Sequence, residues 1–303
     1  MTRRTVALLL GVILGIAPFG PFGCATRAAN LAPPADLLEC ADIFDPVGVP
    51  DGRDGANERD YVYANGLKPA PPADGDKAPA VLYKCYGKGF AVRLNAITRI
   101  PDWVAEDITT DELGTEAERS NKFSVDKTVE DYSSTLEDYR NSGFDRGHQV
   151  PAGDFSADQA MQDQTFVMSN MGPQVGACFN RGIWKELEVS LRNLVNTRQR
   201  LIVFTGPVYA GKLKAIGDVV KDKQGTQLAV PDAYFKVVYA PRDRRAMAFL
   251  IPNARHCDEA YSDPKFRVAV KTVEQQTGFT FFEALPQRLQ TSLKAQPSPA
   301  WSW

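Results

Sequence analysis

The feature that most constrains the fold is a series of short apolar runs, each bounded by turn-forming residues. Four of these runs are rich in Val, Ile, Leu, Phe or Tyr: Val81–Leu94, Leu201–Tyr209, Tyr234–Tyr239 and Ala246–Ile251. Such composition and length are typical of β-strands. The runs predict a central, mainly antiparallel sheet.

One segment, Gly182–Arg198, has the periodicity of a long amphipathic helix. Its apolar residues recur at helical spacing and leave most charged residues on the other side: Ile183, Leu187, Leu191 and Leu194. A second, shorter stretch of this kind is Val268–Gln276, which Gly278 ends. The chain is therefore predicted to be an α+β protein, with helices flanking a central, mainly antiparallel sheet.

Residues 1–28 have the layout of a secretory signal. Two arginines precede an apolar run, Val6–Ile16, that is shorter than the roughly 20 residues of a membrane-spanning helix. Cleavage after Ala28 predicts an exported protein, periplasmic or secreted. The alternative is a lipoprotein signal that ends at residue 23, which would leave the protein lipid-anchored through Cys24.

The remaining chain divides into three predicted parts. Residues 29–80 are rich in Pro, Asp, Gly and Ala and are expected to be irregular. Residues 81–290 are expected to form one folded domain, and residues 291–303 a loose C-terminal tail. The hydrophobic content of 44% in 303 residues is that of an ordinary globular protein.

Four cysteines remain in the mature chain: Cys40, Cys85, Cys178 and Cys257. Disulfides persist in exported proteins, so two bridges are expected. Of the three possible pairings we favour Cys40 with Cys85 and Cys178 with Cys257, because the first pair would tie the irregular segment to the first strand. Four buried free thiols are the alternative.

The charge balance argues against a protein that coats nucleic acid. The formal net charge is −2, from 35 basic and 37 acidic residues. A protein dedicated to coating nucleic acid needs a basic surface, so this class is disfavoured. An enzyme that holds phosphate with a few local arginines and a bound cation is still allowed.

Asp145, Arg146 and His148 place an acid, an arginine and a histidine close together in a turn-prone segment. Hydrolysis of a phosphodiester needs a base that deprotonates water and a positive group on the phosphate. This segment can supply both. The plain alternative is that His148, one of two histidines in the chain, is a packed or surface residue without a role.

A second polar segment precedes the long predicted helix and carries amides at Asn170, Gln174 and Asn180. Amide oxygens and water can hold Mg²⁺, which prefers oxygen ligands. Glu188 lies slightly more than two helical turns after Asn180, so the two side chains face the same way if the helix begins near Asn180. The plain alternative for Glu188 is a solvated helix position.

Two other features receive plain interpretations. His256, beside Cys257, is expected to be a loop histidine without a role. The acidic positions between Glu106 and Glu118 are expected to form a solvated face, because they lack the ligand spacing and central glycine of a calcium loop.

These motifs together resemble the family of non-specific DNA/RNA endonucleases with a ββα-metal site. The likeness extends over roughly residues 85–285 and keeps the family's order. The matching segments are Arg99-Ile-Pro-Asp-Trp-Val-Ala105, Asp145-Arg146-Gly147-His148 with Pro151 and Asp154, Asn170-x-x-Pro-Gln174, Asn180-x-x-x-Trp-x-x-x-Glu188, Thr205-Gly-Pro-Val-Tyr209 and Pro231-x-Ala-Tyr-Phe-Lys236. The resemblance implies that residues 81–290 are a nuclease domain.

The resemblance also implies roles for the residues of the site. His148 would be the general base, Asn180 the protein ligand of one Mg²⁺, and Glu188 an acceptor for water on the metal.

Four further residues receive roles in the same way. Arg146 and Arg99 would contact phosphate. Asp145 would orient the site or accept a hydrogen bond from water on the metal. Asn170 would bind substrate or fix the orientation of the histidine.

The expected function is that of an exported Mg²⁺-dependent endonuclease, with Mn²⁺ as a substitute metal, acting on DNA, RNA or both with little sequence preference. No stable protein partner is expected, and membrane attachment only if Cys24 is lipidated. The alternatives are a catalytically silent nucleic-acid-binding relative, which should have lost the base or the ligand, and a hydrolase of another phosphodiester. A structural envelope lipoprotein would leave the clustered polar motifs unexplained.

Overall fold

The computed structural model describes residues 35–52, 81–211 and 213–297, which all lie within one compact unit, Leu31–Trp303. The predicted signal at residues 1–28, with Cys24, lies outside the described residues, as do residues 53–80 of the predicted irregular segment. No helix in the described ranges is both long and apolar enough to cross a membrane.

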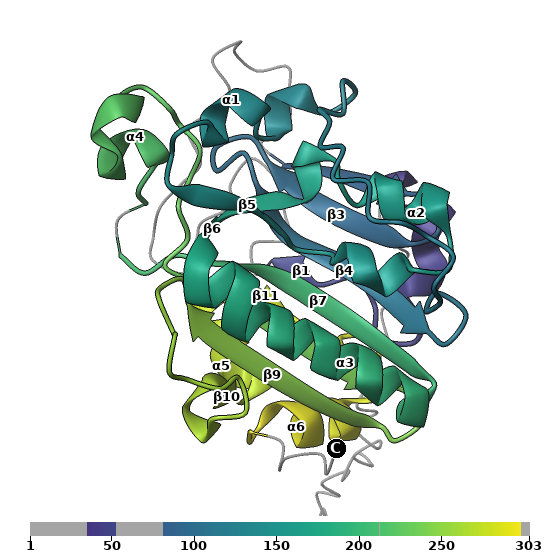
Figure 1. Ribbon diagram of the computed structural model, residues 1–303. Helices are drawn as coiled ribbons and strands as arrows, with labels where there is room; N and C mark the ends of the chain where they lie inside the picture. The colour runs from purple at the N-terminus through teal and green to yellow at the C-terminus, as the bar shows by residue number, and fades with distance from the viewer. Residues whose placement is uncertain (1–34, 53–80, 212, 298–303) are drawn as a thin grey trace, which may run out of the picture. The chain divides into compact units, whose positions relative to one another are not determined.

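A seven-stranded sheet forms the centre of the fold, in the order β10-β9-β8-β7-β4-β3-β2 (Figure 1). Every neighbouring pair in it is antiparallel. The strands are β2 (Val81–Tyr86), β3 (Phe90–Asn95), β4 (Pro101–Thr109), β7 (Arg200–Val208), β8 (Ala233–Ala240), β9 (Arg245–Pro252) and β10 (Arg267–Val268). The predicted α+β class with a central antiparallel sheet is confirmed.

Short elements surround this sheet. The strands outside it are β1 (Asp51–Gly52), paired with β11 (Phe279–Thr280), and β5 (Phe144–His148), paired with β6 (Met171–Val175). The short helices and turns are η3 (Glu130–Tyr132), α1 (Leu136–Tyr139), η4 (Ala152–Phe155), α2 (Gln159–Gln164), η5 (Met168–Asn170), α4 (Ile216–Val219), η7 (Lys221–Lys223) and η8 (Pro264–Phe266).

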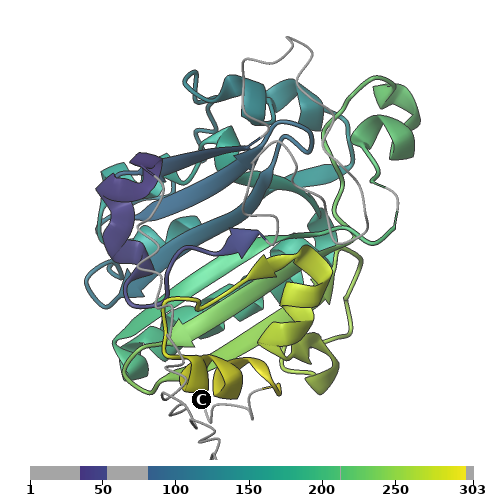
Figure 2. The same cartoon turned by 180° about the vertical axis from the view of Figure 1, so that it is seen from behind.

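Helices cover both faces of the sheet. On one face lies α3 (Trp184–Arg198) (Figure 1). The other carries α5 (Val270–Thr277), α6 (Gln287–Lys294) and η1 (Ala35–Phe44) (Figure 2).

Strand β7 shows how the sequence builds this arrangement. Successive side chains of a strand point to opposite faces. Leu201 and Val203 pack with the α3 residues, whereas Ile202 and Phe204 pack with α5, α6 and η1. Full burial of one such side chain contributes about 1.5–3 kcal/mol, so a strand that is apolar at every position is stabilised from both sides.

Two predicted elements differ in detail. The run Val81–Leu94 is a hairpin of β2 and β3 rather than one strand, and Gly87 adopts a φ of 54° in its turn. Positive φ is accessible to glycine at little cost, which explains the break in an otherwise apolar run. The predicted helix Val268–Gln276 begins at Val270, because Arg267–Val268 pair with β9 as β10.

Both predicted irregular ends contain ordered structure. The segment 29–80 includes η1, whose buried Leu37, Ile43 and Phe44 join the core. The predicted tail 291–303 begins inside α6, where Leu293 is buried. In both places a few apolar residues among polar ones pack against the sheet, and such isolated contacts leave no clear periodic signal.

Two disulfides are present, with the favoured pairing. Cys40–Cys85 joins η1 to β2, and Cys178–Cys257 joins the turn before α3 to the segment after β9.

Candidate active site

The site is a ββα unit formed by β5, β6 and α3. Strands β5 and β6 pair antiparallel, and the π-helical turn η6 (Gly176–Ile183) leads from β6 into α3. Strand β5 carries Asp145, Arg146 and His148, η6 carries Asn180, and α3 carries Glu188. Five of the seven residues predicted for the site therefore come from one supersecondary unit.

Gly147 lets the two strands approach closely at the centre of the motif. A Cβ atom at this position would lie 2.1 Å from Cδ of the buried Gln174 side chain. Real contacts of this kind are longer than 3 Å. Arg146 and His148 can thus flank a position that only glycine fits.

Asp145 fixes the orientation of the Asn180 amide. Its Oδ2 accepts a hydrogen bond from Asn180 Nδ2 at 2.8 Å and lies 3.4 Å from Nε of Arg181. A carboxylate accepts and does not donate, so it selects the NH₂ end of the amide and leaves the amide oxygen for another partner. This geometry favours the orienting role for Asp145.

His148, the predicted general base, is a buried imidazole on β5. It is 9% exposed, and its ring packs edge-on against Phe166 at 4.8 Å and near Phe123 at 5.7 Å. Burial, reinforced by the positive charges of Arg119 and Arg146, lowers the pKa of His148 to about 3. Its Nε2 is buried and has no hydrogen-bond partner among the described residues.

The depressed pKa of His148 predicts a pH dependence of stability. The unfolded chain binds a proton at this histidine below pH 6.5, whereas the folded protein binds it only near pH 3. The free energy of unfolding should therefore decrease as the pH is lowered from about 6.5 towards 3. Between pH 7 and 5, we expect the free energy of unfolding of the wild type to fall about 2 kcal/mol further than that of His148→Gln. Urea denaturation at both pH values measures the difference, and parallel losses in the two proteins would refute it.

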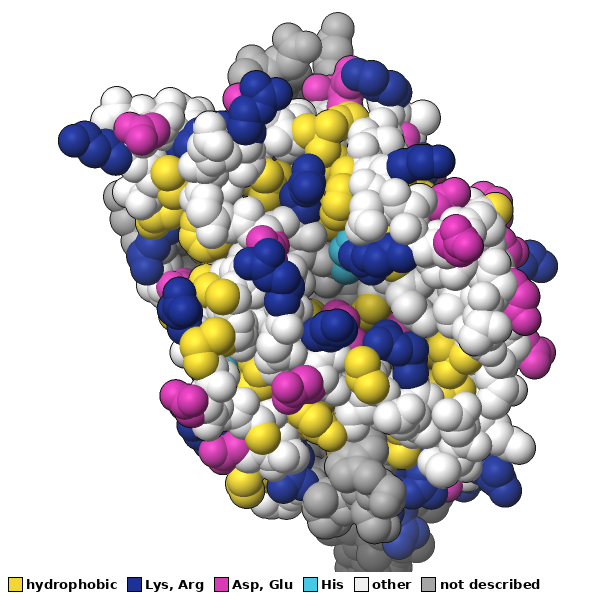
Figure 3. All heavy atoms as spheres, in the orientation of Figure 1, with side chains coloured by type: hydrophobic (Ala, Val, Ile, Leu, Met, Phe, Trp, Pro, Cys, Tyr) yellow, Lys and Arg dark blue, Asp and Glu magenta, His cyan; other side chains and the backbone are white. Residues whose placement is uncertain are grey.

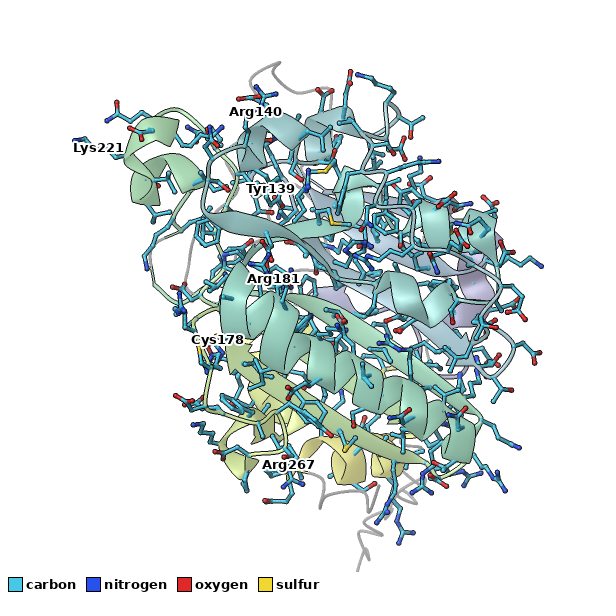
Figure 4. All side chains as sticks on the ribbon, in the orientation of Figure 1. Tyr139, Arg140, Cys178, Arg181, Lys221 and Arg267 are labelled. Carbon is cyan, nitrogen blue, oxygen red and sulfur yellow. A yellow bond between two sulfur atoms is a disulfide. The ribbon has the colours of Figure 1, made fainter. Side chains whose placement is uncertain are left out.

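A groove with a volume of about 610 Å³ runs over β5 and η6. Arg146 and Asn180 line it, together with Arg119, Arg140 and Arg181. Arg140 directly follows α1, and Arg181 lies in η6, just before α3 (Figure 4). Dark-blue Lys and Arg side chains gather around the middle of this face in Figure 3. The groove suits a polyanion despite the net acidic charge of the chain.

Asn170 lies beneath the site and is fully buried. Its Oδ1 accepts from the backbone N–H of Val150 at 3.0 Å, and its Nδ2 donates to the carbonyls of Val150 and Thr165, each at 2.9 Å. All of its polar groups are therefore occupied. The geometry favours the role of holding the backbone that follows His148 and disagrees with direct binding of substrate.

Arg99 lies apart from the groove. Its guanidinium donates to the carbonyl of Ser133 at 2.9 Å and pairs with Asp138 at 3.5 Å. It does not line the groove, and it holds the segment that leads into α1. The guanidinium of Arg99, predicted to contact phosphate, is therefore already engaged by Ser133 and Asp138.

Glu188 is half-buried at the edge of a group of charged side chains between the sheet and α3. Burial raises the pKa of Glu188 to about 7, and repulsion from Asp154 adds to this effect. Arg192, one helical turn further along α3, pairs with Asp154 on η4. Lys236 opposes the rise in the pKa of Glu188.

Glu106 corrects the prediction of a solvated acidic face. This residue of β4 is fully buried, and burial, followed by repulsion from Asp154, raises its pKa well above the usual range. Two cations oppose the rise in the pKa of both Glu106 and Asp154: Arg192 of α3 and, from β8, Lys236. Its ammonium donates to Oγ1 of Thr205 at 2.8 Å and lies 5.1 Å from the ring centroid of Trp184.

Sequence reasoning assigned no role to three cations near the site. Arg192 had a detectable signal, since it follows Glu188 by four positions and so shares its helix face. Lys236 was part of a recognised motif. Arg119 had no local signal: its charge acts on His148 and Glu188, but it reaches them from an irregular segment.

Comparison with known proteins identifies the family. Residues 74–288 match the model of the DNA/RNA non-specific endonuclease family. Nuclease C1 of Cunninghamella echinulata var. echinulata is 38% identical over 212 residues, which are 65% of this chain and 82% of that protein. The mitochondrial endonuclease G of Bos taurus is 33% identical over 250 residues, 77% of this chain and 82% of that protein.

A solved structure shares the fold. The chain is similar to EndoG in a complex with EndoGI, with a TM-score of 0.61 and 29% identity over 68% of this chain and 88% of that one. The matched region contains the ββα unit and the groove described above. The protein is a nuclease that belongs to the family of DNA/RNA non-specific endonucleases.

Proposed function

We propose that the protein is an exported, Mg²⁺-dependent endonuclease that hydrolyses DNA, RNA or both with His148 as the general base. The observation that carries the proposal is the neutral His148, whose Nε2 lacks a partner within the described structure and whose strand also carries Arg146 at an arginine-lined groove. A neutral imidazole nitrogen can take a proton from water.

The bound substrate strengthens this base. Two of the causes that lower the pKa of His148 are the charges of Arg119 and Arg146. A phosphodiester in the groove offsets these charges, so the pKa of His148 rises toward its usual value when substrate is bound. Arg146 then neutralises charge on the non-bridging oxygens while His148 removes the proton from the attacking water.

The residues present fit a hard divalent cation. The Asn180 amide oxygen is free to act as a ligand because Asp145 binds the amide nitrogen. Glu188 would accept hydrogen bonds from the surrounding water. No cluster of three His, Cys, Asp or Glu side chains in the described part of the chain could hold a metal, which suits a cation that keeps several waters. When bound, the cation stabilises negative charge on the leaving oxygen.

Little sequence preference follows from the same groove. Its arginines can reach phosphate oxygens, which are the same at every nucleotide. Export rests on the signal at residues 1–28 and agrees with the two disulfides. Some relatives are named as mitochondrial nucleases, and recovery of the protein from the periplasmic or culture fraction tests export of this chain.

Replacing Asn180 with alanine tests the metal site. The variant loses the amide oxygen but keeps His148 and the arginines. The Mg²⁺ concentration that gives half-maximal nicking of a supercoiled plasmid is expected to rise by roughly 10-fold or more. Arg140→Ala, which changes the groove at a distance from the metal ligand, serves as the control. An Asn180→Ala variant with the wild-type metal titration would remove Asn180 from the metal site.

A further inference from the structure

The segment that follows β9 holds the turn that carries Asn180. We call residues 253–257 the clamp segment. Asn253 begins it: its Oδ1 accepts from the backbone N–H of Val175 at 2.9 Å, and its Nδ2 donates to the carbonyl of Pro173 at 2.9 Å. The end of β6, directly before η6, is therefore fixed to the clamp segment.

His256 extends the contact to the inner side of η6. Its ring lies 6.3 Å from that of Phe179, the residue before Asn180, and packs edge-on against Phe266 at 5.3 Å. Its two nitrogens are hydrogen-bonded to Glu259 and to the carbonyl of Pro252. The loop histidine expected to have no role thus packs beside the turn that carries Asn180.

The third contact is covalent. Cys257 forms a disulfide with Cys178, two positions before Asn180. Cys178 has a φ of 70°, and Ala177 and Gly182 also depart from helical geometry. Cys178 lies at the end of η6 away from the body of α3 (Figure 4). Left-handed backbone disfavours a residue with a Cβ, so a turn of this shape needs restraint from its surroundings.

We propose that the Cys178–Cys257 disulfide positions Asn180 for metal binding, so that the affinity for a divalent cation depends on this bridge being oxidised. The inference rests on the proposed function in one respect, that Asn180 is the metal ligand. Phe179 anchors the buried side of the turn, and the disulfide anchors the side that joins β6. Without the bridge, the Asn180 side chain samples more orientations. It then spends less time in the orientation that binds the metal, so the affinity for the metal falls.

The second disulfide provides a matched control. Cys40–Cys85 joins η1 to β2, which is the last strand at one edge of the sheet. The clamp segment follows β9, near the opposite edge. Loss of either bridge removes a covalent constraint on the unfolded chain, so both losses should lower thermal stability. Only the loss of Cys178–Cys257 should alter metal binding.

The experiment measures direct binding of Mn²⁺ by electron paramagnetic resonance, without substrate. The double variant Cys178→Ser/Cys257→Ser is expected to bind Mn²⁺ roughly 10-fold more weakly than the wild type. The control Cys40→Ser/Cys85→Ser should stay within about twofold of wild type while losing thermal stability. Equal Mn²⁺ affinities in the two double variants would overturn the inference.

Two further arms keep the result interpretable. If Asn180→Ala weakens Mn²⁺ binding and the disulfide variant does not, the inference fails while the proposed metal ligand stands. If Asn180→Ala binds Mn²⁺ normally, the ligand assignment itself fails.

A second approach applies if circular dichroism shows that Cys178→Ser/Cys257→Ser does not fold. The folded wild type is then reduced with dithiothreitol, which becomes a cyclic disulfide as the bridge becomes two thiols. Mass spectrometry of alkylated thiols then identifies the opened bridge, and unchanged Mn²⁺ affinity with Cys178 and Cys257 alkylated overturns the inference.

Discussion

Replacing His148 with alanine should lower the turnover number of nucleic-acid cleavage by on the order of 10² or more, because a positioned general base contributes that much. The side chain packs between aromatic rings and reaches no described partner through Nε2. Its removal therefore takes away a proton acceptor while leaving the arginines and Asn180 in place. Steady-state rates at saturating Mg²⁺ on plasmid DNA measure the change.

Metal binding distinguishes this result from a collapse of the site. Mn²⁺ affinity of His148→Ala should match the wild type, since Asn180 is held by Asp145 and not by the histidine. His148→Gln keeps more of the side-chain volume and should show a similar loss of rate. A folded His148→Ala protein with the wild-type turnover number would show that another group accepts the proton.

Replacing Lys236 with methionine should lower the free energy of unfolding by about 3 kcal/mol, the scale expected when one partner of a buried charge group is removed. Lys236 is 1% exposed, and its charge lowers the pKa of Glu106, Asp154 and Glu188. Methionine fills a similar volume but leaves these carboxyls less well compensated. Urea denaturation at neutral pH gives the difference.

The matched control is Lys271→Met on α5. Lys271 is about half exposed and lies 3.6 Å from the buried Glu274, which also pairs with Lys294 at 2.8 Å. Because Glu274 keeps Lys294 as a partner, loss of the half-exposed Lys271 should cost only about 0–1 kcal/mol. If Lys236→Met proved as mild as this control, the buried charge group would not depend on its lysine. Lower activity of Lys236→Met in the folded state would further indicate that the group positions Glu188.

The sequence predicted the elements with strong periodicity. The apolar strand runs and the helix Gly182–Arg198 were identified because their apolar residues are consecutive in the strands and recur at helical spacing in the helix. Helix α3 begins at Trp184, two residues later than predicted, since the π-helical turn at Gly176–Ile183 precedes it. That turn contacts the clamp segment through the Cys178–Cys257 disulfide and the Phe179–His256 ring contact, which no local sequence pattern reveals.

The same distinction applies to the site. Asp145, Arg146 and His148 share strand β5 because they are close in sequence, and Asp145 accepts a hydrogen bond from Asn180. Arg99 matches a motif of the family, but it pairs with Asp138 and does not line the groove. The sequence did not predict this pair, because only folding brings Asp138 close to Arg99.

Two further residues show why local composition was insufficient. Glu106 lies in an acidic stretch that looked solvated, yet β4 occupies the middle of the sheet and buries it. Arg119 reaches the site from an irregular segment. Burial and long-range charge contacts of this kind depend on the whole fold, so residue type and spacing did not predict them.

The most direct test of the proposed activity uses residues 29–303 with covalently closed plasmid DNA and, separately, with single-stranded RNA, each with Mg²⁺ or with EDTA. A closed circle has no ends, so its cleavage requires an endonuclease. We predict nicked and then fragmented plasmid with Mg²⁺, loss of RNA under the same conditions, and intact substrates with EDTA. Substrates that are bound but remain intact with Mg²⁺ would contradict this account and identify a catalytically silent member of the family.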